Sequence, residues 1–409
     1  MNQQNTNEQN TNQQNTNQQN TKQLLYFDNA ATTPLNPLAL EAMMPYLTGG
    51  YGNPSGIYGF ARNVRKGIEE AREQVAKAIS AEASEIFFTG SGTEANNWAI
   101  RSVLETQVNK GKHIITTVIE HHAITEVCEG LEHMGIEVTY LPVDDRGFVS
   151  PKDLKASIRP DTVLISVMWA NNEIGTIQPM AELSAIAREA KILFHTDAVQ
   201  AIGHIPVDLQ EIPVDLLTIS AHKFGGPKGV GALYIRKGTK IRPFLFGGGQ
   251  EKKRRAGTEN VPGIIGMGKA IEIAIADQKS EYKRVSALRD DLIKRIEETI
   301  PKVSLNGPKG ADRLPGNVNF SFDYIEGESM LLLLDMQGCC ASSGSACSSS
   351  SLEPSHVLMA LGVPHEKAHG SIRFSLGRES TPEDIDRLLE ILPKIIKQLR
   401  AMSPLSEED

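Results

Sequence analysis

Cysteine is scarce in this sequence: there are four among 409 residues, and none forms a Cys-x-x-Cys pair. So few cysteines exclude a disulfide framework, and their spacing disfavours a zinc ribbon, so we expect no metal site. The cysteine usage fits a reducing compartment and a single working thiol.

Long apolar runs and excess positive charge are also missing. No stretch reaches the roughly 18 apolar residues that a bilayer-spanning helix needs, which excludes a membrane span. The formal net charge of -8 at pH 7 disfavours a general binder of nucleic acid or anionic membranes. Residues 1–23 contain neither the apolar stretch of a secretory signal nor the arginines of a mitochondrial presequence, so we expect a cytoplasmic location.

The first 23 residues form a low-complexity segment, with Gln4, Gln9, Gln14 and Gln19 in equivalent places of a five-residue repeat. This segment has no aliphatic or aromatic residue after Met1 and can bury nothing. It is predicted to be a disordered tail. A solubilising or neutral role and a recruitment role both remain open for it.

From Leu24 onward, short β-rich runs alternate with stretches of helical periodicity. Because parallel strands need crossover connections, this alternation predicts an α/β fold with a mostly parallel sheet and helices on both faces. The expected strands are Glu85–Thr89, Ile114–Ile119, Val138–Val143, Thr162–Trp169, Ile192–Thr196, Leu216–Ser220 and Gly231–Ile235.

After about Arg254 the pattern changes to a long helical stretch, Ile264–Ile300, which could bridge two domains. A smaller α+β domain is expected beyond it. Its elements are a strand at Asn317–Phe322, a helix at Glu328–Met336, a Ser/Gly-rich loop at Ala341–Ser351, a strand at Ser371–Ser375 and an amphipathic helix after Thr381.

The most informative stretch runs from Ser220 to Gly229, Ser-Ala-His-Lys-Phe-Gly-Gly-Pro-Lys-Gly, and follows an expected strand. Lys223 in this stretch is held by the turn. A lysine amine beside other cations or apolar walls can become neutral and form an imine with an aldehyde. The alternative for Lys223 alone is an ordinary turn lysine in solvent.

Asp197 ends an apolar strand, and Gln200 follows three residues later. The carboxyl ends of strands are where open α/β sheets bind ligands. With a pyridinium ring as ligand, Asp197 would pair with the ring nitrogen and Gln200 would hydrogen-bond the phenolic oxygen. A helix N-cap is the alternative for Asp197.

A strand, a Gly-Ser-Gly turn and a helix start follow one another near Gly92 and Thr93. Free backbone N–H groups at such a turn form an anion cup, and the hydroxyl of Thr93 adds a donor. Ser220 and His222 could complete a phosphate cradle from the far side. By itself this turn is weak evidence for a phosphate site, because Gly-Ser turns that lead into a helix are common.

His121 and His122 follow another expected strand, where a neutral imidazole could stack on a planar ring and move protons. Asn172, in the sequence Asn171-Asn-Glu-Ile-Gly, could donate to the ring oxygen. Structural histidines and a polar turn are the respective alternatives.

Cys347 lies in a loop of small residues and is expected to be mobile and exposed, as a sulfur nucleophile must be. Cys128, Cys339 and Cys340 are interpreted as ordinary small or core residues. Arg373 shares a strand face with serines, and its guanidinium suits a substrate carboxylate, although a salt bridge is the alternative. Arg378 is interpreted as structural.

The stretch Gly247–Thr258 is glycine-rich and then basic. A solvated flexible loop and a nucleic-acid contact are two interpretations of it. A third, a subunit-interface loop that carries Thr258, follows from the resemblance described next.

Six motifs in order resemble the cysteine desulfurases of the NifS/IscS type, and the resemblance covers about Tyr26 to Leu399. They are Asp28-Asn-Ala-Ala-Thr-Thr-Pro, Gly90-Ser-Gly-Thr-Glu-Ala-Asn-Asn, Asn171-Asn-Glu-Ile-Gly, His195-Thr-Asp-Ala-Val-Gln, Ala221-His-Lys and Ser343-Gly-Ser-Ala-Cys-Ser. The resemblance implies a homodimer of fold type I in the class V aminotransferase superfamily, with pyridoxal 5'-phosphate (PLP) as cofactor. The cysteine loop resembles that of group I enzymes.

The resemblance also implies a role for each candidate residue. The catalytic residues would be Lys223, which binds the cofactor aldehyde, Cys347, which carries the persulfide, and His121, which stacks on the ring. Arg373 and Asn172 would bind substrate. The cofactor contacts would be Gly92, Thr93, His121, Asn172, Asp197, Gln200, Ser220, His222, Lys223 and, from the neighbouring subunit, Thr258.

The implied domain division has a disordered tail at 1–23 and a large PLP-binding domain at 37–285. A small domain at 24–36 and 286–409 would carry the cysteine loop at 341–351. The C-terminal Ser406-Glu-Glu-Asp lacks the aromatic and histidine-rich close of some relatives that dock a scaffold protein, so the choice of scaffold stays open.

The implied reaction converts L-cysteine to L-alanine and moves the sulfur to Cys347. The acceptor would be an iron–sulfur scaffold or a tRNA-thiolation enzyme, with no direct nucleic-acid or membrane contact. No resident metal is expected, although Cys347 could contact an iron–sulfur cluster in transfer. An aminotransferase, a selenocysteine lyase and a binding subunit with a decayed site are the alternatives.

Overall fold

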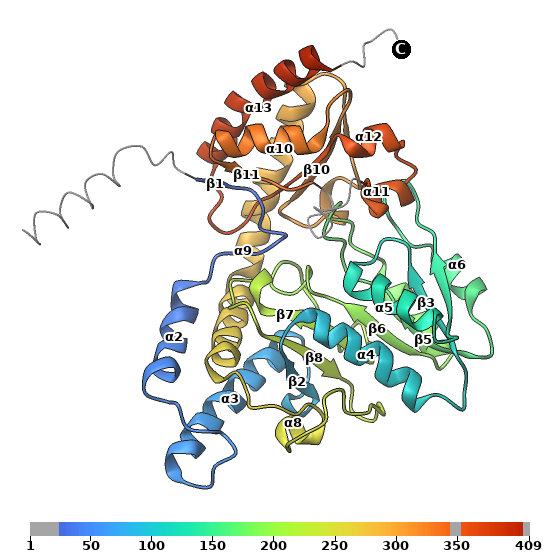
Figure 1. Cartoon of the computed structure of the whole chain (residues 1–409), viewed down its shortest axis with the longest axis vertical. Coiled ribbons are helices and arrows are strands. Elements are labelled where there is room, and N and C mark those ends of the chain that lie inside the picture. The colour runs from blue at the N-terminus through green and yellow to red at the C-terminus, as the bar shows by residue number, and fades with distance from the viewer. Residues whose placement is uncertain (1–23, 344–352, 404–409) are drawn as a thin grey trace, which may run out of the picture.

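The computed structural model describes residues 24–343 and 353–403. Its largest element is a seven-stranded sheet in the order β2-β8-β7-β6-β5-β3-β4 (Figure 1). The strands from β7 to β4 are parallel, whereas β8 is antiparallel to both β7 and β2. This confirms the predicted α/β class. The strands are β2 (Ile86–Thr89), β3 (His113–Thr117), β4 (Glu137–Leu141), β5 (Thr162–Ser166), β6 (Leu193–Asp197), β7 (Leu216–Ser220) and β8 (Gly231–Ile235).

Both faces of this sheet are covered by helices. Alternate residues of a strand face opposite sides, so Ile86 and Phe88 of β2 join one apolar cluster while Phe87 joins the other. The helices of this part are α2 (Pro37–Thr48), α3 (Gly59–Ala78), α4 (Gly92–Thr106), α5 (His122–Glu132), α6 (Pro151–Ser157), α7 (Met180–Glu189) and the short turn α8 (Gln250–Lys253).

A second core lies at the other end of the long helix α9 (Val261–Thr299), which runs from one core to the other (Figure 1). An antiparallel sheet of order β12-β10-β9 packs there, beside the short parallel pair β1-β11. The elements are β1 (Leu25–Tyr26), β9 (Val303–Leu305), β10 (Asn317–Phe322), α10 (Gly327–Met336), β11 (Cys339–Cys340), α11 (His356–Ala360), α12 (His365–His369), β12 (Ser371–Ser375) and α13 (Pro382–Met402).

Two predicted strands are too long, and local polar contacts explain why. The strand expected to reach Ile119 ends at Thr117, whose hydroxyl accepts from the Ile119 N–H and donates to Glu120, so a side chain replaces the ladder. The strand expected to reach Trp169 ends at Ser166, because the Met168 N–H donates to the Glu120 carboxyl at 2.8 Å instead of to a backbone carbonyl of β3.

Other boundaries shift by a residue or a few, and Asp197 is the last residue of β6, as predicted. Among the described helices, none combines the length and the apolarity that a membrane crossing requires.

Candidate active site

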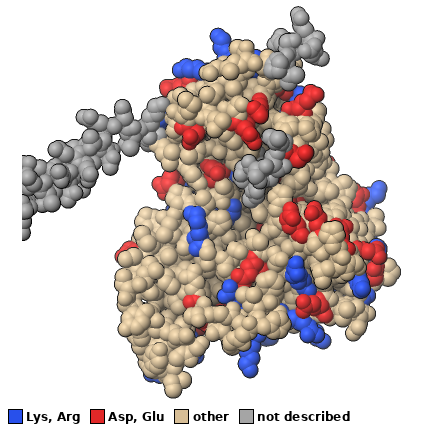
Figure 2. Space-filling view, viewed as in Figure 1, with Lys and Arg blue, Asp and Glu red and all other residues tan. Residues whose placement is uncertain are grey.

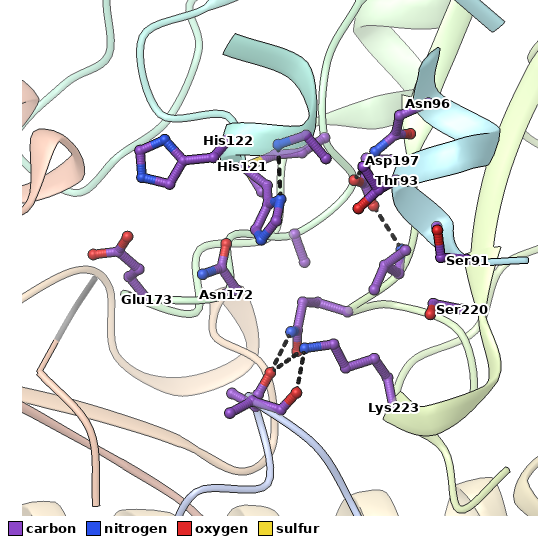
Figure 3. Close-up of a pocket in the computed structure, with 18 of the residues that line it drawn as sticks. Ser91, Thr93, Asn96, His121, His122, Asn172, Glu173, Asp197, Ser220 and Lys223 are labelled. Atoms are coloured by element: carbon purple, nitrogen blue, oxygen red, sulfur yellow. Dashed lines mark hydrogen bonds between the residues drawn. The ribbon is translucent and has the colours of Figure 1, made fainter. Parts of the chain in front are cut away.

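A cavity of about 350 Å³ opens where the parallel strands end. Segments after β3, β5, β6 and β7 and the start of α4 each contribute side chains to it (Figure 3). The sequence-predicted residues that line it are Gly92, Thr93, His121, Asn172, Asp197, Gln200, Ser220, His222, Lys223 and Arg373. The sheet topology brings these together because the carboxyl ends of parallel strands meet at one edge.

Lys223 projects into the cavity from the 3-10 turn Ala221–Lys223, directly after β7. Its Nζ donates to the backbone carbonyls of Ala30, at 2.5 Å, and Ala31, at 2.9 Å (Figure 3). The turn itself is clamped by Thr33, whose hydroxyl donates to the His222 carbonyl at 2.9 Å and accepts from the Gly225 N–H at 2.9 Å. The lysine is therefore held, as predicted, and the N-terminal segment holds it.

Asp197 lies opposite, buried at the end of β6. Its Oδ2 accepts from Nδ2 of Asn96 at 2.7 Å, and its Oδ1 accepts from the Val199 N–H at 2.9 Å. Asn96, on α4, was missed in the sequence although it sits within a quoted motif. The two bonds fix the plane of the carboxylate.

The start of α4 forms the predicted turn beside Asp197. Ser91 is the N-cap and accepts from the Glu94 N–H. A Cβ at Gly92 would come within 3.1 Å of Val199 and 3.3 Å of Ser220, so glycine permits this close approach. The N-terminal end of a helix of this length favours an anion, and Ser91, Gly92 and Thr93 all line the cavity.

Two histidines of the cavity are held in the neutral form. Nδ1 of His121 accepts from the Ala123 N–H at 3.0 Å, which leaves the proton of the neutral ring on Nε2. Burial lowers the pKa of His121, nearby Lys223 lowers it further, and Asp197 opposes the shift. Burial, followed by the charge of Lys223, lowers the pKa of His222 to about 4.

Arg373, on β12, reaches the cavity from the second core. Its guanidinium donates to the Asn172 carbonyl at 3.1 Å and to Asp28 at 3.0 Å. Nε of Arg373 is buried without a partner among the described residues. The salt bridge offered as an alternative is thus present, and it leaves a donor on a cavity-lining cation.

Gln200 and Asn172 also line the cavity. Nε2 of Gln200 donates to the Ala30 carbonyl at 2.9 Å, and the backbone carbonyl of Asn172 accepts from the Arg373 guanidinium.

Two buried carboxyls near the cavity were not predicted. Burial raises the pKa of Glu173, which lines the cavity and accepts from the Ser355 hydroxyl at 2.5 Å, to about 7. Burial likewise raises the pKa of Glu120, which directly precedes His121 in the chain, to about 8. No signal in the sequence marks Ser355 as the partner of Glu173, since 182 positions separate the two residues.

Two predicted site residues are not found in this cavity. Thr258 is exposed and lies outside the cavity lining of its own chain. Cys347 lies outside the described residues. The described residues on either side of it do reach the site: Ser342 pairs with the Arg373 backbone, and His356 lines the cavity.

The donor set fits PLP, the cofactor that the resemblance implies. The cavity offers a fixed carboxylate at Asp197 for a ring nitrogen, a helix N-terminus for a phosphate, and the amine of Lys223 for an aldehyde. Its volume lies within the range of about 300–1,000 Å³ that is usual for small-molecule sites.

Comparisons with known proteins agree with this arrangement. A family model described as class V aminotransferase matches residues 25–388. A cysteine desulfurase IscS from Dictyoglomus turgidum is 60% identical over 387 residues, which are 95% of this chain and 98% of that protein. A solved NifS-like protein is 40% identical, with a TM-score of 0.85 over 93% of this chain and 99% of its own.

A further solved structure, SspA in complex with cysteine, is 35% identical with a TM-score of 0.76, over 86% of this chain and 98% of its own.

Proposed function

Because this chain belongs to the class V aminotransferase family and, within it, to the cysteine desulfurases, we propose that it converts L-cysteine to L-alanine and takes the sulfur onto Cys347. The family is PLP-dependent, so PLP is the cofactor. The observation that carries the proposal is the placement of Lys223, Asp197 and Arg373 around one cavity.

The described residues would hold the cofactor at its ring nitrogen, ring face, phosphate, aldehyde and ring oxygen. Asp197, oriented by Asn96, would pair with the ring nitrogen, and His121 would stack on the ring. The turn of Ser91, Gly92 and Thr93, together with Ser220 and His222, would bind the phosphate. Lys223 would bind the aldehyde, with Gln200 and Asn172 near the ring oxygen.

When bound, PLP supplies an electron sink for cleavage of bonds at the substrate Cα. Arg373 would hold the substrate carboxylate through its guanidinium, and the amine of Lys223 would take the Cα proton. His121 would donate from Nε2 to the substrate thiol, because its Nδ1 accepts from the Ala123 N–H and leaves the ring proton on Nε2.

Cys347 would act as the nucleophile of sulfur transfer. Its thiolate would attack the substrate sulfur, a sulfur–sulfur bond would form, and the carbon–sulfur bond would break with its electron pair left on carbon. Protonation of that carbon gives alanine. Two residues on either side of Cys347 in the chain support this role: Ser342 pairs with the backbone of the cavity residue Arg373, and His356 lines the cavity.

A homodimer would complete the site by supplying Thr258 from the partner. An apolar surface around α2 supports this proposal: Leu40, Leu47 and Tyr51 are 43%, 55% and 81% exposed, and Ile57 is 91% exposed. Few charged side chains appear over α2 and its connection to α3, at the lower left of Figure 2. A contiguous exposed apolar patch is typical of an interface.

Persulfide sulfur would pass to an acceptor protein such as an iron–sulfur scaffold or a tRNA-thiolation enzyme, in the cytoplasm. The division into a large domain (37–285) and a small domain (24–36 and 286–409) stays a prediction. It is supported by the second core, in which Leu25 and Phe27 pack with residues of β10, β12 and α13.

The test is a product balance. The PLP-loaded protein is incubated with L-cysteine and a reductant, and alanine and sulfide are measured together. Equal amounts of the two are expected. A keto acid in place of alanine would identify an aminotransferase and contradict the proposal.

Lys223→Ala is expected to lower the rates of alanine and sulfide formation by at least about 10²-fold. Lys228→Ala is the matched control, because Lys228 is an exposed lysine of the same loop. Full turnover by Lys223→Ala would remove the proposed role of this lysine.

A further inference from the structure

The loop that carries Thr258 is bonded to the cofactor-side turn of its own chain. Arg255 Nε lies 2.7 Å from Oε1 of Glu94, and its Nη2 lies 3.1 Å from Oε2, a two-point contact. The side chains are only 19% and 16% exposed, so water screens the pair less than a surface ion pair.

Glu94 in turn fixes the backbone of that turn. Its Oε2 accepts from the Gly90 N–H at 2.7 Å, and its own N–H donates to the Ser91 hydroxyl at 3.1 Å. A Cβ at Gly90 would stand 2.8 Å from Oε2 of Glu94, so the contact depends on glycine. Glu94 therefore joins Arg255 to the residues that would bind the phosphate.

A second ion pair holds the other end of the loop. Arg72 donates to both carboxylate oxygens of Glu251 at 2.8 Å, and the Phe88 N–H donates to Glu251 at 2.9 Å. Arg72 and Glu251 are buried, at 4% and 7% exposure. The loop is thus fastened to β2 and to α4, the elements that flank the turn.

Between these fastenings the backbone adopts an unfavourable conformation. Glu251, Lys252 and Lys253 have φ angles of 45°, 56° and 64° in succession. Residues with a Cβ rarely adopt this left-handed region, and it persists only where surrounding contacts enforce it. The two ion pairs provide such contacts.

We propose that Glu94 and Arg255 are positioning residues that couple the two active sites of the dimer. The pair joins the phosphate turn of one site to the loop that supplies Thr258 to the other. Arg255 also offsets the charge of Glu94 beside an anion site. The inference rests on the proposed function, in which Thr258 contacts the partner's cofactor.

Mixed dimers test the coupling. One subunit is wild type, and the other carries Lys223→Ala, so that only the wild-type subunit retains a covalently bound cofactor. Cofactor release is followed by visible absorbance in the presence of an aldehyde trap. Adding Arg255→Met to the Lys223→Ala subunit is expected to speed release from the intact site about tenfold, the effect of losing one charge-assisted contact.

Thr258→Ala in the Lys223→Ala subunit tests the contact of Thr258 with the partner's cofactor separately from the coupling through Arg255. If Thr258→Ala leaves cofactor release unchanged, the proposed contact of Thr258 with the partner's cofactor is wrong. If Thr258→Ala speeds release and Arg255→Met does not, that contact stands and the coupling is overturned.

Glu94→Gln, in the same mixed dimer, guards against misfolding of the Arg255→Met subunit. Glutamine can still accept from the Gly90 N–H while losing the ion pair, so release is expected to speed in the same direction. Release at the rate of the Lys223→Ala reference dimer would also overturn the coupling.

Discussion

At the scale of single residues, burial sets the charge state of the groups around the cavity. His222, which lines the cavity, has a pKa lowered by burial to about 4, and His195, buried within β6, has a pKa lowered by burial to about 3, so both are neutral near pH 7. A lowered histidine pKa adds stability at high pH, and that contribution is lost as pH falls from about 6.5 toward the folded-state value. Cofactor-side hydrogen bonding near neutral pH therefore uses neutral imidazoles.

Glu120 should make stability depend on pH in the opposite direction. Burial raises its pKa from 4.5 to about 8, so the folded state keeps the proton that the unfolded state has lost. The contribution of Glu120 to the free energy of unfolding is fully present below about pH 4.5 and declines as the pH rises toward 8. Glu120→Gln, which retains an acceptor for Thr117 and Met168, should remove this decline.

The measurement is the free energy of unfolding of both proteins by denaturant at several pH values. The variant should gain on wild type by a few kcal/mol between pH 5 and 8, since a pH unit corresponds to about 1.4 kcal/mol. Glu129→Gln, at an exposed site on the following helix α5, should show no gain. A constant difference between wild type and Glu120→Gln would contradict the assignment.

At the scale of elements, the N-terminal segment before α2 positions the lysine turn. Thr33→Val removes both hydrogen bonds of its hydroxyl and leaves the Gly225 N–H without this acceptor. The expected cost is about 1–3 kcal/mol of stability, with faster loss of the cofactor, because the segment also supplies the carbonyls that contact Lys223.

Denaturant unfolding and visible absorbance check both effects. Thr299→Val is the control, since the exposed Thr299 hydroxyl donates within its own helix α9, to the Arg295 carbonyl. Equal behaviour of the two variants would show that Thr33 is not needed to hold the turn.

Much of this arrangement could be predicted from the sequence, because local rules determine it. The strand ends that carry Asp197 and Lys223 follow from alternation of apolar runs with helices, and the turn at Gly92 follows from its glycines. Glu173–Ser355 and Glu94–Arg255 could not, because each pair forms only once distant segments fold together, 182 and 161 residues apart.

At the scale of the whole molecule, the exposed apolar face of α2 should be covered in the dimer. Leu40 and Leu47 lie two turns apart on that helix. Leu40→Glu/Leu47→Glu would place two charges in the interface, and burying them would be costly. The variant should sediment as a monomer and lose cofactor faster.

The comparison is Val108→Glu, at a position that is 59% exposed beyond the end of α4. This change should leave the sedimentation coefficient at the value of the wild-type dimer. A dimeric Leu40→Glu/Leu47→Glu protein would place the interface elsewhere.

A cysteine bound in the cavity is expected to give its sulfur to Cys347. The direct measurement is a reaction of PLP-loaded protein with one equivalent of L-cysteine without reductant, followed by intact-mass and peptide analysis. Wild type should gain one sulfur atom at Cys347 and release an equal amount of alanine, while Cys347→Ser should do neither. Alanine release by Cys347→Ser at the wild-type rate, or a persulfide on Cys128, Cys339 or Cys340 instead, would contradict sulfur transfer to Cys347.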